Sequence, residues 1–227
     1  MKSDTREELR KFPMSLVEIR PTILEVPPEK IKDSLKVVSS LNTSLHIDVE
    51  DGIFVPRKNN FTPQFVKEVK REFRFFCDIH LMVQSPLDIV EDYIRAGGDL
   101  ITFHFESSNR PPDVIATIKK FGAQVCLVLK LETEMYLTKP YWGDLEEIAL
   151  MSVNPGFGGQ EFDPRVLGRI KNLRELGYKG KIKVDGGVSA GVAKKIIEAG
   201  ASILVVGTAL FESGNIETSY KKLLSSI

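Results

Sequence analysis

The chain of 227 residues is 42% hydrophobic and 27% charged, and its 31 Lys and Arg balance its 31 Asp and Glu. A net charge of zero argues against a nucleic-acid or anionic-membrane partner, so any anion site must be local. No apolar run approaches the ~20 residues of a membrane span, and residues 1–12 lack the apolar core of a secretory signal. We expect a cytoplasmic protein whose two cysteines, Cys77 and Cys126, are buried free thiols.

Strand-like and helix-like segments alternate from end to end. Residues 1–15 are predicted to be an N-terminal extension or a short surface helix in "SDTREELRKF", capped by Ser3 or Asp4. Period-2 or continuous apolar runs then predict eight strands. They are Leu16–Leu24, Ser44–Glu50, Phe75–Met82, Leu100–Phe105, Gln124–Lys130, Ile148–Val153, Lys181–Asp185 and Ile203–Val206.

Start and stop signals mark most of the intervening helices. An N-cap residue precedes a proline at Thr62-Pro63, Ser85-Pro86 and Asp163-Pro164, and Ser189 is placed to cap "AGVAKKIIEAG". Two apolar stripes are predicted to face a sheet. They consist of Leu87, Val90 and Ile94, and of Val166, Ile170 and Leu173. The connection Leu131–Glu147 is the weakest helix, because Pro140 and Gly143 interrupt it.

Eight βα units in one chain of this length predict an α/β fold of a particular kind, a single-domain (β/α)8 TIM barrel over residues 1–227. A doubly wound open sheet is the competitor, but it seldom needs eight strands in so short a chain. In a barrel the active site lies at the carboxyl ends of the strands.

The stretch "SLHIDVEDG" has two unlike faces. If Leu45, Ile47 and Val49 pack against helices, His46, Asp48 and Glu50 face the barrel lumen, where ionisable groups are costly unless they are paired or bound to metal.

Other strands supply partners for this face. Alternation places Asp78, His80 and Met82 on one side of their strand, and Asp185 ends its own strand. Two His and two Asp meeting at one barrel mouth suit Zn, Fe, Mn or Co as the divalent metal, with His46, Asp48, His80 and Asp185 as the ligands. The alternative is a hydrogen-bonded polar plug. For His104 we favour a place in such a polar plug, or a hydrogen bond that supports one of the metal ligands.

Glycine-bearing turns follow the last three strands, in "NPGFGGQEF", "DGGVS" and "GTALF". Backbone N–H groups in such turns can hold a phosphate without net charge. Ordinary tight-turn chemistry also uses glycine, but three such turns in adjacent loops favour a phosphate site.

The motifs "HIDVEDGIFVP", "HLMVQSP", "ITFHFES", "MSVNPGFGGQEF" and "VDGGVS" resemble those of the ribulose-phosphate 3-epimerase family, in order from Thr22 to Phe211. The resemblance implies a ribulose-phosphate-binding barrel with one divalent metal, an isomerase of carbohydrate metabolism in the pentose phosphate pathway. The reaction implied is inversion at C3 of a ketose phosphate, with D-ribulose 5-phosphate and D-xylulose 5-phosphate as the usual pair. A homo-oligomer is also implied.

Residue roles follow from the resemblance, motif by motif. Asp48 and Asp185 would be the acid/base pair as well as metal ligands, and Thr22 would contact substrate through its hydroxyl. His80 would also lie against the substrate. The substrate's phosphate end would be lined by Gly156, Phe157, Gly158, Gly159, Gly186, Gly187, Gly207 and Thr208.

Several positions depart from the family pattern. Glu50 replaces a methionine beside the metal, whereas Met82 and Met151 remain at the two similar places. Pro27 replaces an Asp, Ile53 a His and Arg57 an Asn. A third carboxylate disfavours an enediolate unless Glu50 is protonated, paired with Arg57 or Lys183, or turned away. Alternatively, Glu50 ligates the metal or reaches another substrate hydroxyl. Our hypothesis is that Glu50 alters substrate preference or slows turnover.

Three alternative functions remain at this stage. The first is the same reaction on another sugar, such as D-allulose 6-phosphate. The second is a decarboxylase or aldol-type barrel, but the D-x-K-x-x-D strand of such decarboxylases has no counterpart, because no lysine lies between His46 and Val55. The third is a degenerate barrel that binds a sugar phosphate with little turnover.

Overall fold

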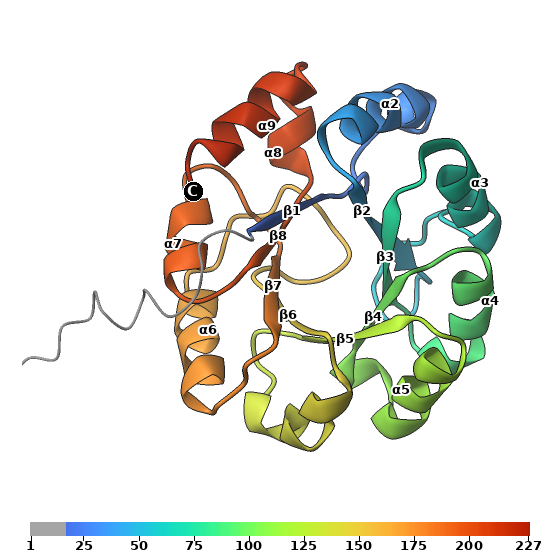
Figure 1. Ribbon diagram of the computed structural model, residues 1–227, viewed down its shortest axis with the longest axis vertical. Helices are drawn as coiled ribbons and strands as arrows, with labels where there is room; N and C mark the ends of the chain where they lie inside the picture. Colours follow the sequence, from blue (N-terminus) through green and yellow to red (C-terminus); the bar gives the residue numbers. More distant parts are fainter. Residues whose placement is uncertain (1–16) are drawn as a thin grey trace, which may run out of the picture.

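The computed structural model describes residues 17–227, and the predicted N-terminal helix with its caps lies outside this range. Eight parallel strands follow one another around a barrel in the order β1-β8-β7-β6-β5-β4-β3-β2. Figure 1 shows β1 beside β2 where the sheet closes. A parallel bridge between Thr22 and His46 joins these two ends. The strands are β1 Glu18–Pro21, β2 Ser44–Glu50, β3 Phe76–Met82, β4 Leu100–His104, β5 Gln124–Leu129, β6 Glu147–Met151, β7 Lys181–Asp185 and β8 Ile203–Val206. The predicted TIM barrel is confirmed.

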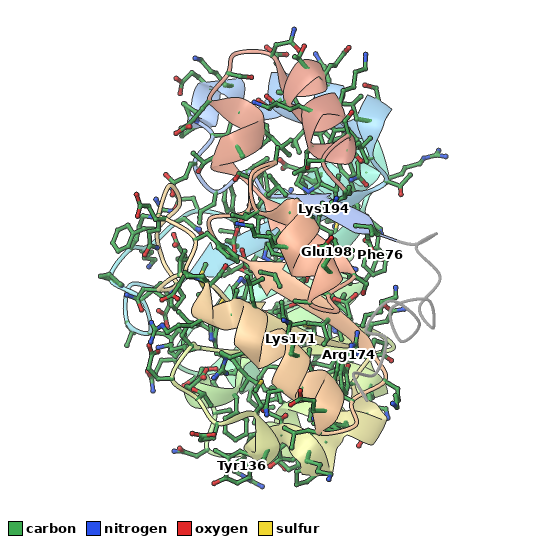
Figure 2. All side chains as sticks on the ribbon, turned by 90° about the vertical axis from the view of Figure 1, so that its left-hand side faces the viewer. Phe76, Tyr136, Lys171, Arg174, Lys194 and Glu198 are labelled. Atoms are coloured by element: carbon green, nitrogen blue, oxygen red, sulfur yellow. The ribbon has the colours of Figure 1, made fainter. Side chains whose placement is uncertain are left out.

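Helices surround the strands on the outside of the barrel. They are α2 Ile31–Leu41, α3 Pro63–Phe73, α4 Val90–Arg95, α5 Pro111–Lys120, α6 Arg165–Glu175, α7 Ala193–Glu198, α8 Thr208–Phe211 and α9 Ile216–Leu224. Short 3-10 segments are η3 Pro28–Lys30, η4 Pro86–Asp88, η5 Phe105–Ser107 and η6 Met135–Asp144. Figure 2 shows Lys171 of α6 and Lys194 and Glu198 of α7 on the outer surface of this layer. No helix within residues 17–227 is long and apolar enough to cross a membrane.

The strand predictions differ from the structure only at the ends. The bounds of β2, β7 and β8 are as predicted, whereas β1 is shorter than Leu16–Leu24 and β6 begins and ends earlier than Ile148–Val153. Phe105 leaves its strand for the 3-10 turn η5. These ends differ because ladder pairing stops where the chain turns toward the next helix, and apolar residues continue past that point.

The helix starts were predicted with mixed success. Thr62 caps α3, with its hydroxyl accepting from the Phe65 amide. Ser85-Pro86 instead begins the 3-10 turn η4, where Leu87 is 41% exposed, so its placement in an apolar stripe was wrong. Asp163 precedes α6, accepting from the Arg165 amide.

Two further helix predictions need correction or refinement. Ser189 does not cap α7 through its hydroxyl; its carbonyl accepts from the Val192 and Ala193 amides. Within the weak segment Leu131–Glu147, residues Met135–Asp144 form the 3-10 helix η6, because Pro140 lacks the amide that a longer α-helix requires there.

The two faces of β2 lie where alternation predicted. Leu45, Ile47 and Val49 are buried in the layer between strands and helices, whereas His46 and Asp48 face other lumen side chains. Part of the lumen is apolar, filled by Leu100, Cys126, Val128, Ala149 and Met151. Cys77 and Cys126 are both buried and free, as predicted.

Deeper in the lumen lies an ion-pair network that sequence reasoning missed. Arg20 donates to both carboxylate oxygens of Glu147 at 2.9 and 2.6 Å, and to Asp78 Oδ2 at 2.9 Å. Lys183 donates to the same Asp78 oxygen at 2.5 Å and to the Thr102 hydroxyl at 2.8 Å. All five residues are at most 1% exposed, so the pairing is what makes their burial tolerable.

Candidate active site

Four side chains from three strands meet at the carboxyl end of the barrel. His46 and Asp48 come from β2, His80 from β3 and Asp185 from β7, and one ligand atom of each lies within 4.8 Å of the others. His46 Nε2 is 3.2 Å from His80 Nδ1, 3.3 Å from Asp48 Oδ1 and 3.5 Å from Asp185 Oδ2. His80 Nδ1 is 2.9 Å from Asp48 Oδ1 and 3.4 Å from Asp185 Oδ2. The structure therefore brings together the four predicted ligands.

These distances fit a divalent cation. A tetrahedral centre with bonds of about 2.0–2.2 Å separates its ligand atoms by about 3.3–3.6 Å. The five separations above, 2.9–3.5 Å, are close to that size, and all four ligand atoms lie within 4.8 Å of one another. Two imidazole nitrogens and two carboxylate oxygens are also a donor set suited to Zn, Fe, Mn or Co. Both the chemistry and the spacing of the cluster fit the predicted cofactor.

Hydrogen bonds behind His46 fix the orientation of its ring. Because its Nε2 faces the cluster, its Nδ1 carries the proton toward Asp78 Oδ2, at 2.8 Å. Burial opposes ionisation of Asp78, but Lys183, His46 and Arg20 hold the pKa of its carboxyl well below the usual value. The ion-pair network thus continues into the site through one carboxylate.

His80 is supported from behind by the third histidine. Its Nε2 lies 3.0 Å from His104 Nε2, and His104 Nδ1 lies 3.3 Å from Glu106 Oε2. Burial lowers the pKa of His104 to about 4, so its ring is neutral and can accept from His80 and donate to Glu106. His104 therefore supports the proposed ligand His80, which is one of the two roles predicted for it from the sequence.

The two carboxylates of the cluster differ in their second oxygen. Asp48 Oδ2 accepts from the Thr22 hydroxyl at 2.5 Å, so the hydroxyl predicted to contact substrate also orients Asp48. Burial raises the pKa of Asp48, but the charge of His46 and its hydrogen bond hold it well below the usual range. In Asp185 burial is likewise outweighed by hydrogen bonds from His46 and His80, which leave its pKa at about 2. Both groups are carboxylates in this arrangement.

A cavity of about 260 Å³ opens above the cluster. It contains every predicted substrate residue: Thr22, His80, Gly156, Phe157, Gly158, Gly159, Gly186, Gly187, Gly207 and Thr208. Asp48, Asp185, Met82 and Met151 line it as well. Its lining therefore extends without a break from the carboxylates to the three glycine turns.

Two glycines of the turn after β7 have neighbouring atoms so close that no side chain would fit. Gly187 has φ of +59°, and a Cβ on it would lie 2.6 Å from the Phe162 amide nitrogen. A Cβ on Gly186 would lie 2.4 Å from Val153. Such tight turns leave backbone amides available to an anion.

Glu50 is paired with Arg57, one of the two partners predicted. Its Oε2 accepts from Arg57 Nε at 2.8 Å and from Asn59 Nδ2 at 3.1 Å, while Lys183 pairs with Asp78 instead. Oε1 is buried with no partner among the described residues. Burial is the main reason that the pKa of the Glu50 carboxyl is raised, and the Arg57 contact opposes it.

Glu25 was missed by the sequence analysis although it lines the cavity. Its Oε1 accepts from the Gly158 amide at 2.7 Å and from Arg57 Nη1 at 2.9 Å. The available signal was its position in the loop that follows β1, because loops after barrel strands build the site.

Fold and site together define a (β/α)8 barrel protein with a cluster of potential metal ligands at the carboxyl ends of its strands. The sequence model of the ribulose-phosphate 3 epimerase family matches residues 18–211. The chain belongs to this family and is an isomerase, an epimerase of sugar-phosphate metabolism.

Curated relatives agree with that assignment. The ribulose-phosphate 3-epimerase of Bacillus subtilis is 34% identical over 220 residues, covering 93% of this chain and 98% of the relative. That of Chlamydia trachomatis is 37% identical over 186 residues, covering 79% of each. That of Escherichia coli K12 is 34% identical and covers 92% of this chain and 93% of the relative.

Solved structures with little sequence identity share the fold. A structure of KGPDC from Streptococcus mutans has a TM-score of 0.73 at 12% identity, covering 92% of this chain and 96% of that one. Orotidine 5'-phosphate decarboxylase from Pyrococcus horikoshii has a TM-score of 0.68 at 18% identity, covering 92% and 98%. These likenesses concern the barrel alone.

Proposed function

We propose that this protein is a metal-dependent epimerase that inverts C3 of D-ribulose 5-phosphate to give D-xylulose 5-phosphate. The observation that supports this most is the cavity that joins Asp48 and Asp185 to three glycine turns. One end offers two carboxylates for proton transfer, and the other offers amides for a phosphate.

Inversion next to a carbonyl requires a proton to leave one face of C3 and another to arrive on the opposite face. Asp48 lies two residues before the end of β2 and Asp185 ends β7, and β1 and β8 lie between those strands in the barrel. The two carboxylates therefore reach the cavity from different directions. One acts as base while the other, in its protonated form, acts as acid, and the reverse reaction exchanges their roles.

Other residues of the chain prepare these groups. Thr22 holds Asp48 through its second oxygen, while Asp78 and His104 orient the two imidazoles. His46, Asp48, His80 and Asp185 would hold a divalent cation, which would supply positive charge against the negative charge that develops when the proton leaves C3. Met82 and Met151 line the cavity and limit water there.

A second sugar remains a candidate because of Glu50. D-allulose 6-phosphate undergoes the same C3 inversion, and the buried Glu50 Oε1 offers an acceptor without a partner among the described residues. A degenerate barrel with little turnover is less favoured, because the four ligands of the cluster remain together. Assembly as a homo-oligomer and a cytoplasmic location stay predictions.

Incubation with D-ribulose 5-phosphate in D₂O tests the proposed function. We expect deuterium to enter C3, because the proton returned by a carboxylate exchanges with solvent. Removing divalent metal with a chelator should lower exchange about 100-fold or more, and adding Zn, Fe, Mn or Co should restore it. The measurement is NMR of C3. Absence of exchange with every metal, together with tight sugar-phosphate binding, would instead support the degenerate barrel.

Replacing Glu50 with Met tests the role of the additional carboxylate. We expect kcat for D-ribulose 5-phosphate to change less than about twofold, because Arg57 already balances the Glu50 carboxylate in the parent. The ratio of kcat/KM between D-ribulose 5-phosphate and D-allulose 6-phosphate should change about tenfold, because a buried acceptor is lost. Parallel assays of both sugars measure this.

The matched variant Glu50→Gln keeps an acceptor and removes the charge. If Glu50→Gln changes the kcat/KM ratio of the two sugars as Glu50→Met does, the charge of Glu50 causes the preference. If its ratio equals that of the parent, the hydrogen-bond acceptor causes it. The hypothesis fails when Glu50→Met leaves both rate and substrate ranking unchanged.

A further inference from the structure

One carboxylate oxygen at the cavity mouth receives hydrogen bonds from two different loops. Glu25 Oε1 accepts from the Gly158 amide at 2.7 Å and from Arg57 Nη1 at 2.9 Å. Gly158 lies in the loop after β6, and Arg57 in the loop after β2. The three loops are thus connected at a single negatively charged oxygen.

The two donors are those of an anion-binding site. A backbone amide in a glycine turn and a guanidinium both favour phosphate as well as carboxylate oxygens. A Cβ on Gly158 would lie 2.3 Å from Glu25 Cγ, so the turn admits the carboxylate only because residue 158 is glycine. Gly158 and Glu25 both line the cavity whose glycine turns are proposed to hold the substrate's phosphate.

Arg57 is fixed independently of Glu25. Its Nε donates to Glu50 Oε2 at 2.8 Å, and its guanidinium lies 5.7 Å from the centroid of the Phe157 ring. The Glu50 side chain is fully buried, whereas that of Glu25 is 38% exposed. If Glu25 moves, Glu50 still holds the guanidinium in place, and the Glu25 carboxylate can turn into water at small cost.

Arg57 also has capacity for a further acceptor. Its Nη2 is buried and has no hydrogen-bond partner among the described residues. Buried donors are seldom left unpaired, so Nη2 would gain a partner if an anion with more oxygens replaced the Glu25 carboxylate. A phosphate offers several oxygens, where the carboxylate places only Oε1 between the two donors.

We propose that Arg57 and the Gly158 amide bind the phosphate of the substrate, and that Glu25 is an internal competitor which this phosphate displaces. The inference rests on the proposed function, because it places the sugar's phosphate in this loop. A phosphate monoester dianion can displace the carboxylate, whereas an unphosphorylated sugar cannot. Glu25 and Arg57 thereby determine specificity for phosphorylated substrates.

Calorimetric titration of the full chain with inorganic phosphate tests the proposal. In Glu25→Ala the Kd for phosphate should fall about tenfold, because the competing carboxylate is removed while both donors remain. The control is Glu29→Ala, which removes the same charge from an exposed position in η3 nearby. We expect the control to change the Kd less than about twofold.

A triple variant shows whether Arg57 is the donor responsible. Glu25→Ala/Glu50→Met/Arg57→Asn removes the guanidinium without leaving Glu50 buried and unpaired, and most of the tenfold gain should disappear. Circular dichroism confirms that each variant is folded. An unchanged or weaker phosphate affinity in Glu25→Ala, or a gain that persists in the triple variant, overturns the proposal.

Deuterium exchange on the same preparations separates this inference from the proposed function. If the parent exchanges C3 of D-ribulose 5-phosphate while Glu25→Ala leaves phosphate affinity unchanged, only the competitor role fails. If the parent shows no exchange with any metal, the proposed reaction fails, and the phosphate titration still decides the role of Glu25.

Discussion

Asp185→Asn should lower kcat for C3 epimerisation about 1000-fold, because an amide cannot exchange a proton with the substrate. The two faces of C3 should then behave differently. With Asp48 intact, one of the two epimers should still exchange its C3 proton with D₂O, while conversion to the other epimer nearly stops. Asp48→Asn should show the opposite preference. NMR of C3 with each epimer separately measures both effects.

The same substitution also changes a proposed metal ligand, so metal content must be measured alongside activity. Inductively coupled plasma mass spectrometry on each variant gives the bound metal, and rates are compared per metal-loaded site. The control is Asp33→Asn, an exposed position of α2, which should leave the rate unchanged. If metal-loaded Asp185→Asn loses C3 exchange equally with both epimers, the two carboxylates do not act on opposite faces of C3, and the prediction is wrong.

Lys183→Met should destabilise the folded barrel by about 3–5 kcal/mol, because it leaves buried carboxylate charge uncompensated. In the parent, Arg20 pairs with Glu18, Asp78 and Glu147, while Lys183 pairs with Asp78 and lies 3.7 Å from Glu147. Without Lys183, Asp78 keeps Arg20 and His46 as partners, whereas Glu147 keeps only Arg20, which also pairs with Glu18. Urea denaturation followed by circular dichroism gives the free energy of unfolding.

The identical substitution at an exposed site provides the comparison. Lys36 is 59% exposed and pairs with Asp33 at 3.4 Å, so Lys36→Met should cost less than about 1 kcal/mol. Adding Glu147→Gln to Lys183→Met removes one of the carboxylates that Arg20 must then balance, and should recover part of the lost stability. If Lys183→Met alone costs under about 1 kcal/mol, the network is not needed to stabilise the buried charges.

Much of the candidate site followed from sequence periodicity. Alternation in β2 and β3 placed His46, Asp48 and His80 in the lumen, because a strand has a side-chain period of two. Asp185 could be added because it ends a strand, and parallel strands of a barrel end at the same mouth. Glycine spacing likewise indicated the three turns that line the cavity.

Contacts between loops could not be predicted in the same way. Glu25, Arg57 and Gly158 belong to three loops far apart in the chain, and loops have no period from which to infer a direction. The same holds for the partners of Lys183, which depend on how β3, β6 and β7 are staggered around the lumen. Leu87 shows the converse error, since its apolar spacing was correct but the helix had not yet begun there.

The sequence by itself therefore determined the barrel, the end at which its site lies and the four potential metal ligands. These depend only on the period of side chains along each strand and on the order of the strands. Only the tertiary structure decided which charges neutralise one another. Glu50 pairs with Arg57 and not with Lys183, and Glu25 accepts a hydrogen bond from the Gly158 amide. These pairings depend on distances between segments, which the order of residues along the chain does not give.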